Sequence, residues 1–432
     1  MNAPFYIIDG IRTPFCKMGT DLARESAADL GTQAAKQLLA KTSVSPDNID
    51  HVITGCVGQP VGDANLSRVI ALRAGLPESV PAHTVHRNCA SGLEALTQAQ
   101  QMAAAGNGEL FLVIATESMS QYPLLFPHST GKKFAQLARA RTSGAKLSAM
   151  LNFRPRDFQP QIALRMGLTD PTCGLNMGET AENLARDFNI SRTEQDLYSL
   201  YSHKKATAAR NRLRTEVFPY IPSSAGSRPI LVENDNGPRA EQSRKALTKL
   251  KPVFERKYGN VTAGNSSQVT DGAVALLVAT DKAAEKYGLQ PLGRLIHASY
   301  VGCKPSRMGL GPVYAMDVAE KKTGLSLHDA DIIEINEAFA AQVLAVAKAC
   351  KSEEFCKKEL KRAKALGRIP ADRLNVNGGA IALGHPVGAT GARLVLTTLK
   401  ELQLRKARRG LISLCVGGGQ GAAVWLEAEQ HN

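Results

Sequence analysis

The sequence predicts an α/β protein that is built from two similar halves. Two observations carry this prediction: short apolar runs typical of buried strands alternate with helical patterns, and the same order of elements occurs twice along the 432 residues. The composition, with 44% hydrophobic residues and 37 glycines, is that of a globular protein with a large core. We therefore expect two or three domains, two of which arose by duplication.

The repeat begins with a strand that follows an aspartate, Asp50 in the first half and Asp331 in the second. A helix, a buried strand and a final strand follow in each half. In such a pair of α/β units, ligands are expected where the carboxyl ends of strands and the N-termini of helices converge. The matching pairs are 51–54 with 332–335, the helices that follow Cys89 and His385, 110–116 with 410–415, and 274–279 with 422–426.

The segment between the halves, 119–264, is richer in helix signals, proline and charge. Its clearest helix begins at a capping box, Ser191 with Glu194. We interpret this segment as a cover or loop domain. The predicted domains are an N-terminal half of 1–118 with 265–288, the loop domain of 119–264, and a C-terminal half of 289–432.

The net charge of +14 is unevenly distributed. Seven lysines and arginines lie between Ser118 and Arg156 without an acidic residue, and a second basic stretch covers 404–409. Such clusters attract polyanions or anionic lipid, and they also occur on solvated faces and at helix C-termini. Because no DNA- or RNA-binding motif accompanies them, we expect no nucleic-acid partner.

Three features predict a cytoplasmic protein. No run of about 18 apolar residues is present, so no membrane span is expected. The start at Met1–Pro4 shows neither a signal peptide nor an Arg-rich transit peptide. Eight cysteines without a CxxC pair are typical of a reducing compartment and speak against a disulfide framework or a zinc site.

Cys89 stands where a loop turns into a helix, in the run Asn88-Cys89-Ala90-Ser91-Gly92. A thiol at a helix start lies near the positive end of the helix dipole and near unpaired N–H groups. Both favour the thiolate, which attacks carbonyl carbon. Since a free cysteine is also commonly a small buried hydrophobic residue, the local sequence alone leaves both interpretations open.

Two further reactive groups occupy related places in the second half. His385 lies in the glycine-rich run 384–391, and Cys415 precedes the glycine-rich turn 417–421. Glycines after a strand let backbone N–H groups approach a ligand closely. The turn alone fits a phosphate cradle or a tight turn, and His385 alone fits a structural histidine. Two cysteines and a histidine on duplicated halves are hard to explain by packing, so we expect a catalytic site.

This constellation resembles the thiolase family, and the match runs nearly from end to end. The resemblance implies the thiolase fold, in which two duplicated α/β halves form a layered αβαβα core beside a mostly helical loop domain. The motifs that carry it are 88–92, 336–340, 377–380 with 384–391, and 415–419, and lesser matches are 9–15, 116–119, 177–183 and 261–267.

The resemblance implies reversible cleavage of 3-ketoacyl-CoA by a ping-pong route. Cys89 is then the nucleophile, His385 its general base, and Cys415 the proton donor to the acetyl-CoA enolate. The backbone N–H groups of Cys89 and Gly417 serve the first oxyanion, and a water held by Asn336 together with His385 serves the second. No permanently bound cofactor or metal is implied, and coenzyme A is a co-substrate.

The resemblance also implies a set of coenzyme A and substrate contacts. Most of these residues line the pantetheine channel, and Met177 lies near the acyl end. For Phe254 and Met308, core packing is the competing interpretation. The set is Ser267, Ala263, Gly264, Phe254, Met308, Phe339 and Met177.

The chain mixes features of two branches of the family. Asn176 stands where short-chain biosynthetic thiolases often carry His. The long segments 121–175 and 348–373 resemble the β-subunits of fatty-acid-oxidation trifunctional complexes, although those usually have His at the position of Asn336. The resemblance therefore favours a degradative 3-ketoacyl-CoA thiolase, with biosynthetic acetyl-CoA acetyltransferase as the alternative.

Partners and rival functions stay open at this point. The resemblance implies a homodimer or homotetramer and allows an α-subunit with hydratase and dehydrogenase activity. The basic insertion 121–175 is expected to form a helical hairpin that covers the acyl tunnel, touches a membrane surface peripherally or docks a partner. A ketoacyl synthase would use two histidines in place of His385 and Cys415, and an inactive interaction subunit would not need Cys89.

Overall fold

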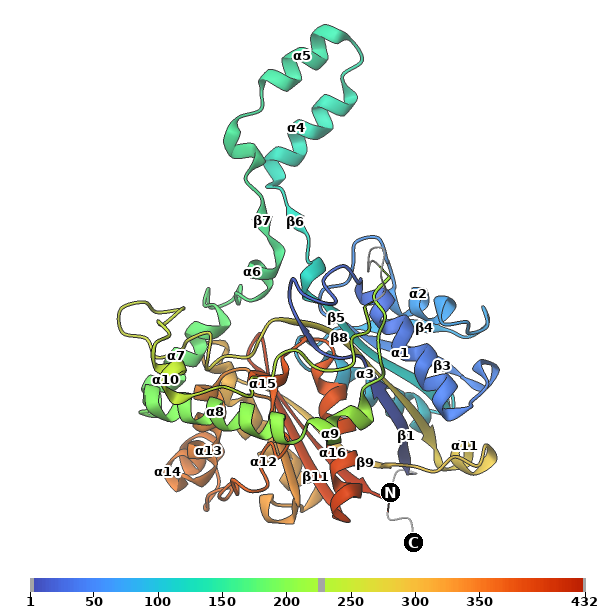
Figure 1. The fold of residues 1–432 in the computed structure, drawn as a ribbon, viewed down its shortest axis with the longest axis vertical. Helices are drawn as coiled ribbons and strands as arrows, with labels where there is room; N and C mark the ends of the chain where they lie inside the picture. The colour runs from blue at the N-terminus through green and yellow to red at the C-terminus, as the bar shows by residue number, and fades with distance from the viewer. Residues whose placement is uncertain (1–3, 224–229, 430–432) are drawn as a thin grey trace.

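The computed structural model describes residues 4–223 and 230–429. Residues 1–3, on which the prediction about a leader sequence rests, and the last three residues of the predicted C-terminal half lie outside the described residues. Within the described ranges, ten strands form one mixed sheet, and helices cover it (Figure 1). None of the helices in these ranges is long and apolar enough to cross a bilayer.

The N-terminal half contributes the section β1–β8–β5–β3–β4 of this sheet. β3 runs parallel to β4 and β5, whereas β8 is antiparallel to both β5 and β1. The short β2 (Cys16–Lys17) pairs with β8. The bounds are β1 (Phe5–Arg12), β3 (His51–Gly55), β4 (Ala82–Val85), β5 (Leu110–Ser118) and β8 (Thr270–Thr280).

The C-terminal half repeats this arrangement as β10–β11–β12–β9, with a parallel bridge from Ile333 to Leu374 in the place of β4. The two halves meet where β1 pairs with β9, through only two residue pairs, Tyr6 with Arg294 and Ile7 with Gly293. The bounds are β9 (Gly293–Gly302), β10 (Ile332–Ile335), β11 (Arg409–Val416) and β12 (Gln420–Ala428).

The two aspartates that precede the repeat do the same work in each half. Asp50 Oδ2 accepts the N–H groups of Glu109 and Leu110 at 2.7 and 2.9 Å, at the start of β5. Asp331 Oδ2 accepts those of Arg408 and Arg409, both at 2.9 Å, at the start of β11. The duplicated α/β architecture expected from the sequence is therefore confirmed.

Two helices fill the layer between the sheet sections, α3 (Ser91–Ala104) and α16 (Thr390–Arg405). They touch at their first turns, where a Cβ on Gly92 would lie 2.9 Å from Ala392 N and one on Gly391 would lie 2.9 Å from Leu93 N. Glycine is needed at both positions because the backbones are in contact. This contact brings the loop before α3 and the loop before α16, with Cys89 and His385, to one place.

The outer faces carry the remaining layers of helices. α1 (Ala27–Thr42) and α2 (Leu66–Arg73) pack on the N-terminal section, and α1 begins at the capping box of Ser26 with Asp29. On the C-terminal section the predicted insertion 348–373 folds into the end of α13 and into α14 and packs there. The helices of that face are α12 (Gly311–Thr323), α13 (Ala340–Lys351) and α14 (Glu353–Glu359).

The middle segment supplies helices that flank the C-terminal half. The predicted capping box Ser191 with Glu194 begins α8, as expected. The buried carboxylate of Glu337 fastens this helix by accepting the hydroxyl groups of Tyr198 (2.9 Å) and Ser202 (2.6 Å). The domain boundaries stated above stay a prediction. Its helices are α7 (Met177–Asp187), α8 (Arg192–Ala208), α9 (Arg210–Leu213) and α10 (Arg244–Thr248), while α11 (Asp281–Lys286) and α15 (Ala380–Leu383) belong to the N-terminal and C-terminal halves.

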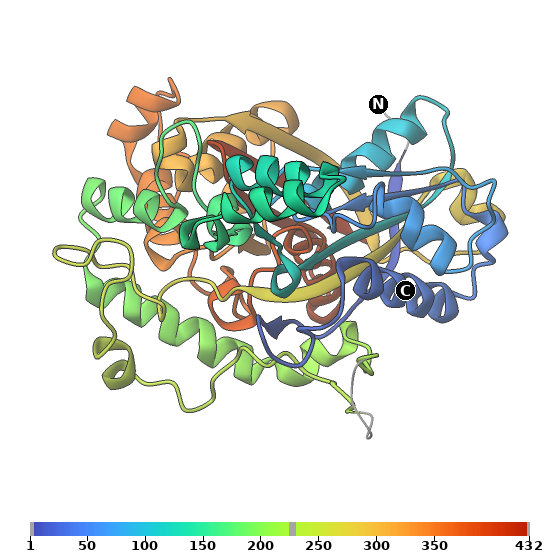
Figure 2. The ribbon, with the colours of Figure 1, turned by 90° about the horizontal axis from the view of Figure 1, so that it is seen from above.

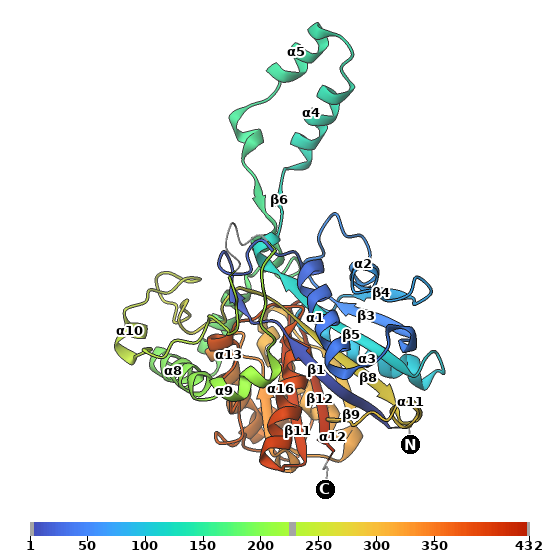
Figure 3. The same ribbon diagram turned by 45° about the vertical axis from the view of Figure 1, so that its right-hand side comes forward.

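The basic insertion forms an arm that stands clear of the body (Figures 1 and 3). Two short antiparallel strands carry it, and two helices form the expected hairpin at its tip, which Figure 2 shows end-on above the sheet. Phe134 contacts Phe126, Phe153 and Phe158 inside the hairpin. The elements are β6 (Leu124–Leu125), α4 (His128–Arg139), α5 (Ser143–Leu151), β7 (Gln161–Ile162) and α6 (Ala163–Gly167).

Candidate active site

Cys89 lies in a tight turn directly before α3. Asn88 has a φ of 43°, a left-handed conformation that asparagine tolerates better than most residues. The turn is closed by hydrogen bonds from Ala90 N to Arg87 O and from Ser91 N to Asn88 O, both at 2.9 Å. The sequence around the cysteine therefore folds so that the sulfur precedes the first helical turn, as expected.

The thiol is less acidic than its position at a helix start suggested. Burial raises the pKa of Cys89 to about 11, although hydrogen bonds from the N–H groups of Gly417 and of Cys89 itself lower it. The N–H groups at the helix start therefore lower this pKa as expected, but desolvation raises it by more. At neutral pH the resting sulfur is a thiol, so a base has to remove its proton.

The glycine-rich turn after β11 lies against Cys89. Asn88 Nδ2 donates to Gly417 O at 2.8 Å, while the Gly417 N–H points at the Cys89 sulfur. Gly419 has a φ of 76°, and a Cβ there would lie 2.4 Å from Cys303 O. The turn therefore requires glycine and presents an N–H group beside the nucleophile, which is the geometry of an oxyanion hole.

Cys415 is the last residue but one of β11 and lies near Cys89. It is 1% exposed, and burial together with the charge on Cys89 raises the pKa of its thiol well above the ordinary value. A protonated thiol is the form that can give a proton to a carbanion. The structure thus places Cys415 near Cys89 in a state that fits the proton-donor role implied by the resemblance.

His385 is held in one tautomer by Thr390. The Thr390 hydroxyl donates to Pro386 O at 3.0 Å, so it accepts the N–H of His385 Nδ1, which lies 2.6 Å away. Nε2 is therefore the unprotonated nitrogen and carries the lone pair. Burial, and then the charge of Arg393, lower the pKa of His385 to about 3, which keeps the ring neutral. A neutral imidazole with a free Nε2 is a proton acceptor.

Asn336 faces that same nitrogen. Its Nδ2 lies 3.3 Å from His385 Nε2, and the side chain is 1% exposed just beyond the end of β10. Among the described residues no partner satisfies its buried Oδ1. A buried oxygen without a protein partner usually binds water. This fits the water-holding role that the resemblance implies for Asn336.

Glu117 connects the two halves at the site, and sequence reasoning assigned it no role. Its buried carboxylate accepts the N–H groups of Val57 at 3.0 Å, Gly58 at 2.8 Å and Gly388 at 2.9 Å. It also accepts the Tyr122 hydroxyl at 3.0 Å. The loop after His385 is therefore tied to the end of β3 in the other half. The motif 116–119 contained this residue, but nothing local showed which donors would reach it.

A cavity of about 470 Å³ opens from the Cys89 sulfur. Its lining includes Val57, Met119 and Tyr122 together with residues of α6 and the turn that follows it. Its lining is mostly apolar, which suits an acyl chain. Residues that line it are Val57, Asn88, Cys89, Met119, Tyr122, Leu164, Met166–Thr172, Met177, Val387, Gly417 and Gly418.

The predicted coenzyme A contacts fall into two places. Met177 lines the cavity at Cys89, and its sulfur would lie 3.7 Å from a Cβ on Gly417. The ring of Phe254 meets that of Phe339 edge-on at 5.9 Å, and the buried Met308 belongs to the same apolar cluster.

The turn that carries Ala263, Gly264 and Ser267 runs alongside this aromatic pair. Ser266 bridges to Phe339, and Ser267 N donates to Ala338 O at 2.9 Å. Ala263 is exposed, whereas Gly264 is buried against Leu250. These residues therefore lie beside the aromatic pair and apart from the Cys89 cavity, and the role of the predicted contacts in binding coenzyme A stays a prediction.

Asn176, the departure noted in the sequence, has a local task. Its side chain caps α7 by accepting the Gly178 N–H at 3.0 Å, and Glu179 completes the capping box by accepting the Asn176 N–H. The residue therefore fixes the start of the helix that carries Met177.

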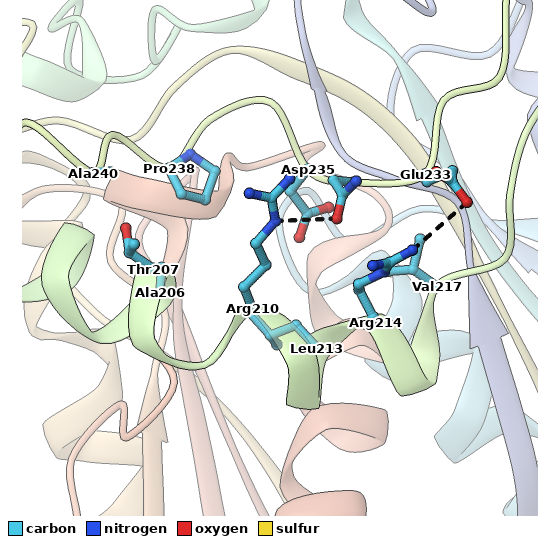
Figure 4. A pocket seen from close by; sticks show the side chains of 11 residues that line it. Ala206, Thr207, Arg210, Leu213, Arg214, Val217, Glu233, Asp235, Pro238 and Ala240 are labelled. Carbon is cyan, nitrogen blue, oxygen red and sulfur yellow. Dashed lines mark hydrogen bonds and ion pairs between the residues drawn. The ribbon is translucent and has the colours of Figure 1, made fainter.

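A second cavity, of about 150 Å³, lies between α9 and the chain near Asp235 (Figure 4). Arg210 and Arg214 extend into it, and each has an acceptor: Asn234 Oδ1 at 3.3 Å and Glu233 Oε1 at 3.6 Å. Asp235 is bound by the buried Arg12 at 2.7 Å. Because these charges are balanced within the protein, we place the chemistry at Cys89.

Comparisons with known proteins agree with this geometry. Residues 5–282 match the family model of the thiolase N-terminal domain, and 289–428 match that of the thiolase C-terminal domain. A probable 3-ketoacyl-CoA thiolase of Caenorhabditis elegans is 36% identical over 98% of this chain and 93% of its own length. An acetyl-CoA acetyltransferase of Chromobacterium violaceum is 38% identical over 98% of both chains.

Solved structures show the same relationship. The crystal structure of human mitochondrial 3-ketoacyl-CoA thiolase superposes with a TM-score of 0.84 at 36% identity and covers 99% of both chains. That of the Bacillus anthracis acetyl-CoA acetyltransferase gives a TM-score of 0.85 at 33% identity, over 99% of this chain and 100% of its own. On these matches, the chain belongs to the thiolase family of acyltransferases.

Proposed function

We propose that the protein is a 3-ketoacyl-CoA thiolase that works in the degradative direction, as in fatty-acid β-oxidation. The observation that carries this proposal is the Cys89 sulfur, which accepts N–H groups from Gly417 and from its own backbone at the mouth of an apolar cavity. Coenzyme A and acyl-CoA are the substrates in this proposal, and no resident cofactor takes part.

The first half-reaction begins with a proton transfer. His385 Nε2 takes the proton of the Cys89 thiol, and the sulfur attacks the 3-keto carbon of the substrate. The bond between carbons 2 and 3 then breaks, and its electron pair stays on carbon 2 as the acetyl-CoA enolate. Cys415 gives its proton to that carbon, so acetyl-CoA leaves and the shortened acyl group stays on Cys89.

The second half-reaction returns every proton. The Cys415 thiolate takes the proton of a coenzyme A thiol, whose sulfur attacks the acyl carbon on Cys89. The shortened acyl-CoA leaves, and the Cys89 sulfur takes back the proton held by His385. Since Thr390 fixes Nδ1, the same Nε2 atom accepts and returns this proton.

Two oxyanions need stabilisation along this route. The acyl oxygen on Cys89 would accept the N–H groups of Cys89 and Gly417. The enolate oxygen would accept the Nε2–H of protonated His385 and a water on Asn336. Donors that are already in place need no reorganisation when charge develops, and losing one typically costs about 2.7–4 kcal/mol.

The size of the cavity favours the degradative role over synthesis of acetoacetyl-CoA. About 470 Å³ is far more than an acetyl group needs, because a water molecule takes about 30 Å³ in the liquid. A site that served only acetyl transfer would gain nothing from this room. Acyl groups longer than acetyl therefore suit the site better.

Thiolysis of a ladder of 3-ketoacyl-CoA substrates tests the proposal. With coenzyme A, the protein should convert chains of four to sixteen carbons to acetyl-CoA and the shortened acyl-CoA, separated by chromatography. Without coenzyme A, mass spectrometry should find the acyl group on Cys89. Complete activity in Cys89→Ala, or turnover of malonyl thioesters instead of 3-ketoacyl-CoA, would contradict it.

A second proposal concerns the arm, which we infer touches an anionic membrane surface. Leu147, Met150 and Leu151 on α5 are at least 58% exposed, and Arg139 and Lys146 lie exposed on the same hairpin. Exposed apolar side chains among cations are typical of an interfacial element. We also propose that the protein forms a homo-oligomer, that a β-oxidation α-subunit is a partner, and that the protein is cytoplasmic.

Co-sedimentation with vesicles tests the arm. Binding should occur with phosphatidylglycerol vesicles, weaken with salt, and fall in a variant with Leu147, Met150 and Leu151 changed to Ser. As a control, Lys282→Ser, 85% exposed on the body, should bind as well as the unmodified protein. Binding that is unchanged by salt and by the Ser substitutions at Leu147, Met150 and Leu151 would contradict the proposal.

A further inference from the structure

Tyr122 stands at the junction between the catalytic cavity and the arm. It lines the cavity together with Cys89, and β6 begins two residues later. Its ring lies against Gly58, where a Cβ would come within 2.0 Å of Tyr122 Cε1. The chain thus leaves out a side chain at residue 58 and fills that space with the tyrosine ring.

The ring is anchored at its hydroxyl end. Tyr122 donates to Glu117 Oε1 at 3.0 Å, and Glu117 is itself fixed by the N–H groups of Gly58 and Gly388. Burial, and then the charge of the Glu117 carboxylate, raise the pKa of Tyr122, so the hydroxyl stays a donor. A ring that is held at one end and packed on one face cannot turn aside for a ligand.

The part of the cavity lining that comes from α6 and from Leu168 directly after it is aliphatic. Leu164, Met166 and Leu168 come from α6 and the turn after it, at the return end of the arm. Met166 is 52% exposed, and methionine adapts its shape more readily than other apolar side chains. The cavity therefore has one rigid aromatic wall and one flexible aliphatic wall.

We propose that Tyr122 determines the length of the acyl group that Cys89 accepts. An acyl chain on the Cys89 sulfur shares the cavity with the anchored ring and with the adaptable side chains of α6. Glu117 is the positioning residue that keeps the ring in place. This inference rests on the proposed thiolase activity, since it concerns the acyl group of that reaction.

The experiment compares chain-length profiles of three proteins. The kcat/KM for thiolysis is measured from four to sixteen carbons for the unmodified protein, Tyr122→Phe and Tyr122→Ala. In Tyr122→Ala, the ratio of kcat/KM for the longest substrate to that for the shortest should rise about tenfold or more. A difference of one methylene group in an apolar pocket already gives discrimination of about this size. Tyr122→Phe keeps the ring on Gly58 but loses the hydrogen bond to Glu117, so its ratio should rise less than that of Tyr122→Ala.

The outcomes separate the two proposals. No thiolysis by the unmodified protein would overturn the proposed function. Activity with an unchanged profile in Tyr122→Ala, or an equal change in Tyr122→Phe, would overturn the role of the ring. If Tyr122→Ala does not fold, Tyr122→Leu replaces it in the experiment and should raise the same ratio of kcat/KM values. Tyr201→Ala, a tyrosine 57% exposed on α8, is the matched control and should leave the profile unchanged.

Discussion

The side chains of Thr390 and His385 lie 2.6 Å apart, and the threonine hydroxyl is already committed to Pro386 O. The hydrogen bond between them can therefore run only from His385 Nδ1–H to the Thr390 oxygen. A residue five positions further along the chain thus decides which ring nitrogen acts as the base. The glycine-rich motif 384–391 contains both residues, and its final threonine is a positioning residue for the histidine.

Replacing Thr390 by Val should reduce kcat about tenfold and leave KM nearly unchanged, because a hydrogen bond worth about 1 kcal/mol holds the reactive tautomer. Nitrogen NMR of labelled histidine should show the proton no longer confined to Nδ1. Thr390→Ser keeps the oxygen and should retain most of the activity. Equal losses in the Ser and Val variants would contradict the role of the hydrogen bond.

Asn336→Ala should lower kcat by about 10²–10³-fold, the usual effect of losing an oxyanion donor, while substrate affinity stays near that of the unmodified protein. Asn336→Asp, which is nearly isosteric, should lose at least as much because it places a negative charge beside the enolate. Steady-state thiolysis, together with thermal unfolding to show that both variants fold, checks this. An aspartate variant as active as the unmodified enzyme would remove Asn336 from the mechanism.

Alkylation of Cys89 should be slow near neutral pH and rise about tenfold per pH unit until about 11, because only the thiolate reacts. At pH 9.0, which is the ordinary pKa of a thiol, about one Cys89 sulfur in a hundred is ionised. Since the folded pKa is raised, the stabilisation by the neutral thiol is complete below about 9 and is lost as the pH rises through about 11. Short pulses of iodoacetamide with mass spectrometry measure this, and a rate independent of pH below 9 would indicate a thiolate paired with imidazolium.

Gly391→Ala should destabilise the fold by about 1–3 kcal/mol, since the new Cβ would press on the backbone of α3 at 2.9 Å. Gly131→Ala is the matched control: this glycine lies inside α4 with nothing within 4 Å of its Cβ position. That variant should be neutral or more stable by about 1 kcal/mol, because alanine favours the helix. Chemical denaturation gives both values, and equal effects would contradict the close contact of the central helices.

Local patterns in the sequence predicted most of the scaffold. The apolar runs of β3, β5, β10 and β11 are short and well bounded, so the repeat was visible from Asp50 and Asp331 onward. The capping box of α8 was visible for the same reason: all of its partners lie within one turn. The hairpin of the arm could be predicted from the length and the helix signals of 121–175, whereas the role of the arm cannot be deduced from its shape.

Other features could not be predicted because they depend on residues far apart in the chain. Glu117 ends an apolar strand, and its partner Gly388 lies 271 positions away. The pKa of Cys89 depends on burial that exists only after the Cys415 turn has closed over it. The sequence shows the helix start, whose N–H groups lower that pKa, but it does not show the desolvation that raises it.

The paired aspartates also allow equivalent positions in the two halves to be compared. Five residues after Asp50 and Asp331 stand Gly55 and Asn336, and three residues before Gly92 and Gly391 stand Cys89 and Gly388. A side chain at Gly55 would lie 2.3 Å from Ser91 O, and one at Gly388 would lie 2.7 Å from Glu117 Oε2. The equivalent positions in the other half are thus closed to any side chain, so the duplicated halves do not duplicate the site.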